Sequence, residues 1–122
     1  MGKNIEKKIT FLSYLVLAQF FLTIALIGAL GNTFVIATNG GKMPVYADWE
    51  RVNSKEHFAF DDKNEVNNFL LTDIIPINMK SIEARISIGD ILMLYGFLGV
   101  TGLWIYLLIG ISKGNKGVNK RR

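Results

Sequence analysis

No charged residue interrupts the stretch from Ile9 to Gly41, which reads ITFLSYLVLAQFFLTIALIGALGNTFVIATNGG. A second charge-free stretch runs from Ile91 to Ser112 and reads ILMLYGFLGVTGLWIYLLIGIS. A helix needs about 20 consecutive apolar residues to cross the hydrocarbon core of a bilayer, and each stretch is long enough. A soluble domain of this size would need charged faces on its helices. The sequence therefore predicts an all-α membrane protein in which two transmembrane helices form a hairpin.

The first stretch follows a basic segment, as the apolar part of a secretory signal peptide does. A signal peptide has an apolar part of about 7–15 residues. Here the apolar run is roughly twice as long before its first polar break at Asn32. We therefore expect a retained helix. The alternative is cleavage at the small residues around Ala29 and Gly31.

Composition excludes several classes of site. The chain has 122 residues and no cysteine, which rules out disulfides, thiolate metal sites, cysteine nucleophiles and lipid attached to a thiol. The segment between the two stretches, residues 42–90, is too small for more than a marginal fold of its own. We expect it to pack on the helix ends as a structured loop that contains a short interfacial helix, because Val66, Phe69 and Leu70 repeat at helical spacing.

The charges predict an orientation. The segment before the first stretch has a net charge of +2, the tail after the second has +5, and the segment between them has −3. Lys and Arg near helix ends are retained on the cytoplasmic side. We therefore expect a multi-pass protein of the cell membrane with both termini cytoplasmic.

The basic tail is expected to attract anionic lipid, or to act only as a topology signal. Nucleic-acid binding is not expected, because no aromatic residues interleave with the basic ones.

These observations divide the chain into five parts. They are a basic cytoplasmic leader (1–8), transmembrane helix 1 (9–38), an extracytoplasmic loop (39–90), transmembrane helix 2 (91–112) and a basic cytoplasmic tail (113–122).

Both predicted helices carry small residues. Helix 1 has a face formed by Ala18, Ala25, Ala29 and Asn32, and helix 2 carries Gly96, Gly99, Gly102 and Gly110. In lipid, helices associate through such faces and through polar side chains, here Gln19. The two helices could pack on each other through these faces, or dock onto another subunit.

Two loop motifs predict local structure. Asn39-Gly40-Gly41, followed by Pro44, is typical of a helix stop and turn. Ser87-Ile88-Gly89-Asp90 has the capping-box pattern, in which Ser87 accepts from the amide of Asp90 and Asp90 reaches back.

No spacing in the chain requires a catalytic, cofactor or metal site. His57 with Asp73 or Asp90 could form a base and its orienting carboxylate, or could bind a metal, but a single loop histidine is usually just solvated. The candidate functional residues are those of the turn, the loop elements and the helix start. They are Asn39, Gly40, Gly41, Met43, Pro44, His57, Asp73, Pro76, Ser87, Gly89 and Asp90.

Three segments resemble a bacterial membrane family of unknown function, number 5317. They are the helix end and turn from Gly31 to Val45, the element Phe69–Pro76, and the helix start Ser87–Leu92. The resemblance covers roughly Gly31 to Gly99, and its Asn-Gly-Gly turn is moderately specific. It implies the topology and the outer turn elements, because the family has no known activity. The chain departs from the family pattern in having two spans, where members typically have about four.

We therefore expect a small two-pass membrane protein that is a non-enzymatic accessory or subunit, packed against a membrane protein partner or a second copy of itself. One alternative is a small-ligand or metal site on the extracytoplasmic face, built from Asn39, His57, Asp73 and Asp90. Another is a holin-like protein that assembles with itself in the membrane. The lack of a polar stripe along either helix argues against this last function.

Overall fold

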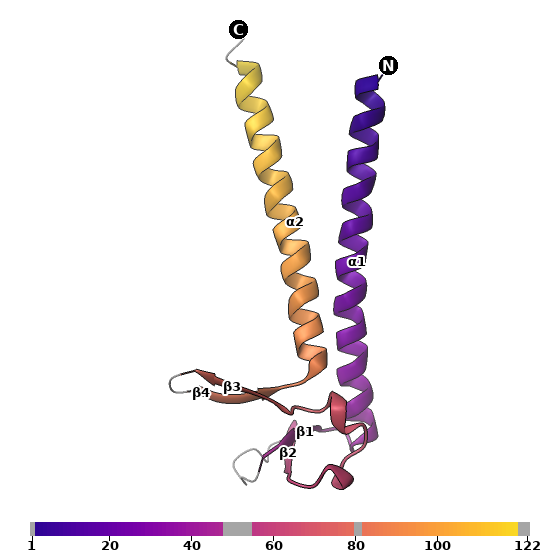
Figure 1. The fold of residues 1–122 in the computed structure, drawn as a ribbon, viewed down its shortest axis with the longest axis vertical. Helices are drawn as coiled ribbons and strands as arrows, with labels where there is room; N and C mark the ends of the chain where they lie inside the picture. Colours follow the sequence, from indigo (N-terminus) through magenta and orange to yellow (C-terminus); the bar gives the residue numbers. More distant parts are fainter. Residues whose placement is uncertain (1, 48–54, 80–81, 120–122) are drawn as a thin grey trace.

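Two long helices dominate the structure, a computed structural model that describes residues 2–47, 55–79 and 82–119. Helix α1 (Gly2–Thr38) and helix α2 (Ile88–Asn119) lie side by side, with the N- and C-terminal ends of the chain at the same end of the pair (Figure 1). The mostly helical fold with two long apolar helices is confirmed. Both helices extend further toward the chain ends than the predicted spans 9–38 and 91–112.

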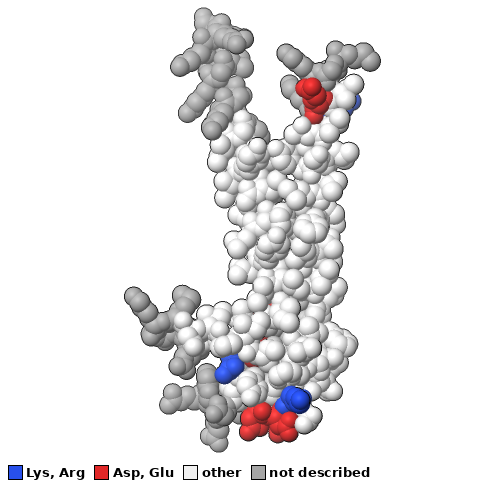
Figure 2. Space-filling view, viewed as in Figure 1, with Lys and Arg blue, Asp and Glu red and all other residues white. Residues whose placement is uncertain are grey.

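Most large apolar side chains of the two helices are exposed. Phe11 on α1 and Leu98 on α2, for example, are 65% and 62% exposed. On the face that Figure 2 shows, the sides of the helix pair carry no coloured Lys, Arg, Asp or Glu along most of their length, and the coloured charged side chains lie toward the two ends of the molecule. Within the described residues, the segments Lys8–Thr38 and Ile88–Gly110 are long and apolar enough to cross a membrane.

The helices touch where glycines remove the side chain. A Cβ atom on Gly96 of α2 would lie 2.6 Å from the carbonyl oxygen of Phe21 and 2.7 Å from the Cβ of Ala25. A Cβ atom on Gly28 of α1 would overlap the carbonyl oxygen of Gly89. Such backbone-to-backbone approach is how helices pack in the absence of a hydrophobic driving force.

Other positions on the helices have no neighbour. Nothing in the described chain lies within 4 Å of a Cβ built on Gly31, Gly102 or Gly110. The side chain of Gln19 is exposed. The predicted small-residue faces are therefore used only in part by the pairing of α1 with α2.

The segment between the helices, which we call the cap (residues 39–87), contains strands as well as short helical turns. Its elements are β1 (Met43–Tyr46), β2 (His57–Phe60), the 3-10 turns η2 (Lys63–Glu65) and η3 (Phe69–Leu71), β3 (Ile75–Met79) and β4 (Ile82–Ile86). Strand β1 pairs with β2 in parallel, and β3 pairs with β4 in antiparallel orientation. The small sheets correct the all-α prediction.

The predicted interfacial helix is shortened to the 3-10 turns. Asn68 adopts the left-handed conformation with φ 58°, which breaks the helical path between Val66 and Phe69. Thr72 is extended and Pro76 lies in β3, so no helix continues beyond Leu71. The helix predicted from the spacing of Val66, Phe69 and Leu70 is therefore not formed as one continuous element.

The best-buried part of the molecule lies where the cap meets the helix ends. Val35 near the end of α1, Pro44 in β1, Thr72 after η3 and Ser87 before α2 are almost fully buried. They come from four different segments, so the cap and the helix pair share one small core. This core positions the polar groups described next.

Candidate functional site

A hydrogen-bonded network joins the two helices at the cap. The amide Nδ2 of Asn32 on α1 donates to Oδ1 of Asp90 on α2 at 2.7 Å. The hydroxyl of Ser87 lies 2.8 Å from Oδ1 of Asn32 and 2.9 Å from Oδ2 of Asp90. Because this hydroxyl has one proton, it donates to one of the two oxygens at a time. The network therefore connects α1 to the start of α2 through side chains alone.

The predicted capping box at the start of α2 is confirmed. The backbone N–H of Asp90 donates to the hydroxyl of Ser87 at 3.0 Å, and the backbone N–H of Ser87 donates to Oδ2 of Asp90 at 2.9 Å. The carboxylate of Asp90 also lies in the first turn of the helix, where a negative charge is favourable.

Gly89 allows the network to form. A Cβ atom at this position would overlap Oδ1 of Asn32. Any side chain there would push α1 away and separate Asn32 from Asp90. Gly89 therefore acts by permitting close approach, and its role is structural.

Asp73 lies beside this network with its carboxyl group buried. Its backbone N–H donates to the carbonyl of Pro44 at 3.0 Å, and its carbonyl accepts from the N–H of Tyr46 at 3.0 Å. The residue is 6% exposed, and its Oδ1 atom has no hydrogen-bond partner within the described chain. Burial, and to a lesser extent the negative charge of Asp90, raise the pKa of Asp73 to about 7.

Asn39 forms a clamp between the end of α1 and the cap. Its Nδ2 donates to the carbonyls of Val35 at 2.8 Å and Asn67 at 3.0 Å, and its Oδ1 accepts from the N–H of Asn67 at 2.8 Å. The Nδ2 of Asn67 donates in return to the carbonyl of Thr38 at 2.8 Å. Asn39 thus satisfies backbone groups at a helix end and fixes the segment before η3.

Replacing Asn39 with alanine should loosen this clamp. The change removes three hydrogen bonds at a partly exposed position, so we expect a loss of about 2 kcal/mol in the free energy of unfolding. Hydrogen exchange of the Asn67 amide should accelerate in the same variant. Asn64→Ala, on the exposed side of the cap, provides the control. Equal exchange of Asn67 in the two variants would contradict the clamp.

The turn after α1 has the predicted stop geometry. Gly40 and Gly41 have φ angles of +70° and +83°, and the N–H of Gly41 donates to the carbonyl of Ile36 at 2.9 Å. Both conformations favour glycine. Met43 and Pro44 follow in β1 with buried side chains. These four candidate residues therefore act in the described chain as a helix end and a strand start.

His57 and Pro76 lie in other parts of the cap. His57, the first residue of β2, pairs with Met43 of β1. Asp73 forms a bridge to Val45, which also lies in β1. The backbones of His57 and Asp73 are thus separated by β1 and lie at least about 10 Å apart at ordinary strand spacing. Pro76 is exposed in β3 and pairs with Arg85.

The structure therefore brings Asp73 and Asp90 close to each other and leaves Asn39 and His57 elsewhere. Among the described residues, no three His, Cys, Asp or Glu side chains are placed to hold a metal ion. The buried carboxyl group of Asp73 remains as the chemically unusual group of this site.

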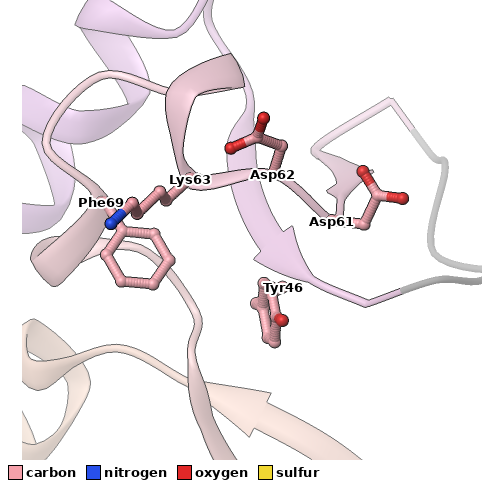
Figure 3. A pocket seen from close by; sticks show the side chains of 5 residues that line it. All are labelled: Tyr46, Asp61, Asp62, Lys63 and Phe69. Atoms are coloured by element: carbon pink, nitrogen blue, oxygen red, sulfur yellow. The ribbon is translucent and has the colours of Figure 1, made fainter.

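A shallow hollow opens on the cap, away from this network. It has a volume of about 450 Å³ and is lined by Tyr46, Asp61, Asp62, Lys63 and Phe69 (Figure 3). The rings of Tyr46 and Phe69 stand nearly perpendicular, with centroids 6.3 Å apart. Aromatic walls beside carboxylates suit a cationic group. Residue spacing had not indicated this hollow, because its lining comes from three separate segments.

A second, apolar cleft lies between the helices near the chain ends. Its volume is about 650 Å³, and its lining includes Phe11 and Tyr14 from α1 and Trp104 and Leu108 from α2. Tyr14 and Tyr106 bridge the helices beside it, with ring centroids 5.9 Å apart. The cleft holds apolar groups on both sides and has Glu6 at its edge.

Sequence reasoning placed Asn32 on the small-residue face and missed its polar role. An amide inside a charge-free run, on the same face as Ala25 and Ala29, was the available signal. The partner, Asp90, lies 58 positions further along the chain, so no local pattern connected the two.

One family model matches the chain. It describes a family of unknown function, DUF5317, and matches residues 3–101, which include α1, the cap and the first part of α2. The match extends beyond the resemblance noted from Gly31 to Gly99. No curated protein and no solved structure matches. Since the match covers most of its length, the chain belongs to the family of unknown function DUF5317.

Proposed function

We propose that the chain is a two-pass protein of the cell membrane and a non-enzymatic accessory or subunit, whose helix pair packs against another transmembrane helix. Both helices expose apolar side chains over a length sufficient to span the hydrocarbon core. A soluble monomer rarely exposes so large a contiguous apolar surface. This supports a membrane location.

The charge distribution supports an orientation with both termini cytoplasmic and the cap outside. Residues 2–8 of the basic leader and 113–119 of the basic tail lie at the helix ends opposite the cap (Figure 1), and the loop between the helices is acidic overall. The positive-inside rule places such short basic segments in the cytoplasm. There the tail would also attract anionic lipid, with about 1 kcal/mol per basic residue near the surface.

Gln19 is the observation that carries the partner proposal. Phe21, Ala25 and Gly28 contact α2, and Gln19 precedes Phe21 by two residues, or about 200° around the helix. Its side chain is exposed and has no hydrogen-bond partner within the described residues. An amide in lipid without a partner is unfavourable, and interhelical hydrogen bonds are its usual solution. We infer that a third helix supplies that partner.

Replacing Gln19 with leucine should weaken the association. Crosslinking in intact cells, followed by mass spectrometry of proteins bound to a tagged chain, should give one dominant adduct. Gln19→Leu should reduce its yield several-fold, as expected for the loss of about 1 kcal/mol. Ser13→Leu is the matched control, because the Ser13 hydroxyl is already bonded to the Ile9 carbonyl at 3.0 Å within the helix.

The identity of the adduct separates the partner classes. A foreign membrane protein would make the chain an accessory subunit, and an adduct of two copies would make it a homo-oligomer. Recovery of the bare monomer from gentle detergent, together with equal yields for both variants, would contradict the proposal.

A second candidate function is supported by the hollow of Figure 3. Its two aspartates outnumber the one cation of the lining, Lys63, and together with two aromatic rings they would suit a small ligand with a cationic group at the outer face. This replaces the predicted set of Asn39, His57, Asp73 and Asp90 as the place for such a ligand. Titration of the purified chain with a quaternary ammonium salt, monitored through Tyr and Trp fluorescence, tests it. An Asp61→Asn, Asp62→Asn double variant should bind more weakly.

A further inference from the structure

The carboxyl group of Asp73 is the least satisfied polar group in the described chain. It is 6% exposed, and Oδ1 is buried without a hydrogen-bond partner. The backbone of Asp73 is bonded to Pro44 and Tyr46 of β1, which holds the residue at this buried position. A buried carboxylate is costly unless it is paired, coordinates a cation or is neutralised by a proton.

The negative charge of Asp90 makes a second buried carboxylate less favourable. Asp90 accepts hydrogen bonds from Asn32 Nδ2 at 2.7 Å and from the backbone N–H of Ser87 at 2.9 Å, and the Ser87 hydroxyl is a third donor within reach. These donors reach both carboxylate oxygens of Asp90. A second negative charge on Asp73 would therefore stand beside one that is already held in place.

The remaining charged and titratable groups of the adjoining elements do not compensate. On β4, Arg85 donates to the carbonyl of Ile74 at 3.4 Å, and its guanidinium lies 5.3 Å from the ring centroid of Tyr46 on β1. Arg85 forms no ion pair with Asp73 in the part of the chain that the structure describes. The hydroxyl of Tyr46 supplies no positive charge.

The arrangement favours a proton over a metal ion. Asp90 and Asn32 already use their polar atoms in hydrogen bonds to each other and to Ser87. The unoccupied Oδ1 of Asp73 is one ligand atom, whereas hard divalent cations take six or more oxygen ligands. The described residues include no cluster of three metal-binding side chains. A proton needs a single lone pair and no extra space.

We propose that the junction of Asp73 with Asp90, Asn32 and Ser87 is a proton-binding site that couples the pH of the compartment facing the cap to the docking of the cap on the helix pair. With the proton bound, the Asp73 carboxyl is neutral and the cap stays docked. When the proton leaves, a buried negative charge on Asp73 adds to the nearby charge of Asp90, and the cap loosens. The raised pKa of Asp73, about 7, sets this change in the neutral range.

The direction of the pH effect follows from linkage. Unfolded aspartate has a pKa of about 3.9, so between about pH 4 and about pH 7 the docked state holds a proton that the undocked state releases. Docking is therefore strongest in acid and weakens as pH rises toward about 7, with little further change above that. Below about pH 7, the equilibrium constant for undocking of the cap should rise by up to tenfold for each pH unit.

The test uses the full-length chain in detergent micelles from about pH 5 to about pH 9. Limited proteolysis of the cap reports the undocked fraction, and infrared spectroscopy reports the C=O stretch of a protonated carboxyl group. For the wild type we expect cleavage to accelerate up to about pH 7 and then level off, while the carboxyl band disappears. Asp73→Asn, which imitates the protonated form, should lack the band and remain slowly cleaved at every pH. The exposed Glu65→Gln variant should behave as the wild type.

Three results would overturn the site. They are a wild-type cleavage profile that does not depend on pH, an infrared band unchanged by Asp73→Asn, and a transition whose midpoint moves with added Ca²⁺ or Na⁺. The last result would make the ligand a metal cation. If Asp73→Asn does not fold, the infrared spectrum of the wild type tests the site alone. The proposal requires the C=O band of its protonated carboxyl group to disappear near pH 7. The proposal needs no membrane partner, so failure of the Gln19 experiment leaves it intact.

Discussion

Replacing Gly28 with alanine should separate the helix pair and lower the free energy of unfolding by about 3 kcal/mol. The added Cβ atom would overlap the carbonyl oxygen of Gly89 and would lie 2.9 Å from the backbone nitrogen of Met93. Both are backbone atoms of α2, which cannot move without displacing the whole helix. The extra methyl group therefore forces the helices apart over the contact that also holds Asn32 near Asp90.

Gly31→Ala is the matched control for this prediction. It adds the same methyl group three residues along α1, where no atom of the described chain lies within 4 Å. Alanine is the better helix former, so this variant should be neutral or stabilised by up to about 1 kcal/mol. Thermal unfolding in detergent, followed by tryptophan fluorescence, measures both. Equal midpoints for the two variants would mean that the close approach at Gly28 does not hold the pair together.

Replacing Asp90 with alanine should have the second large effect. The change leaves Asn32 Nδ2 and the N–H of Ser87 without their acceptor and deletes the capping interaction at the start of α2. Two partly buried donors without a partner cost about 3 kcal/mol together. Hydrogen exchange of the amides in the first turn of α2 should accelerate with the loss of stability.

The same substitution has a second consequence at Asp73. Removing the charge of Asp90 removes the smaller of the two causes that raise the pKa of Asp73. The pH transition of the cap should therefore move to lower pH while burial keeps it above that of free aspartate. Glu65→Ala, which removes an exposed carboxylate, should leave both the exchange rates and the transition unchanged. A shift in Glu65→Ala as large as in Asp90→Ala would show that the effect is a general change in surface charge.

The turn after α1 and the capping box before α2 could be predicted because each depends on interactions between residues that are close in sequence. The turn at Gly40 and Gly41 depends on residues that tolerate positive φ angles, and the capping box joins Ser87 to a residue three positions on. Each can be read from a few adjacent letters. The two long helices were equally readable, because a charge-free run of that length has few other stable forms.

The strands of the cap could not be read in the same way. Strand β1 has four residues, and its partner β2 begins fourteen positions later at His57. Such short strands carry little pattern of their own, and their stability comes from contacts with the rest of the cap. At Asn68, one left-handed residue was enough to end a helix that spacing had favoured.

The sequence by itself determined two long apolar helices, a connecting cap of opposite net charge and the helix ends that adjoin the cap, because hydropathy and capping act over neighbouring residues. Only the tertiary structure decided which polar groups meet. Asn32 and Asp90 are 58 positions apart and come together because Gly28 and Gly89 let two backbones touch. Asp73 becomes unusual only when its bonds to β1 hold it in a buried position near Asp90, since burial and a neighbouring charge are properties of the folded chain.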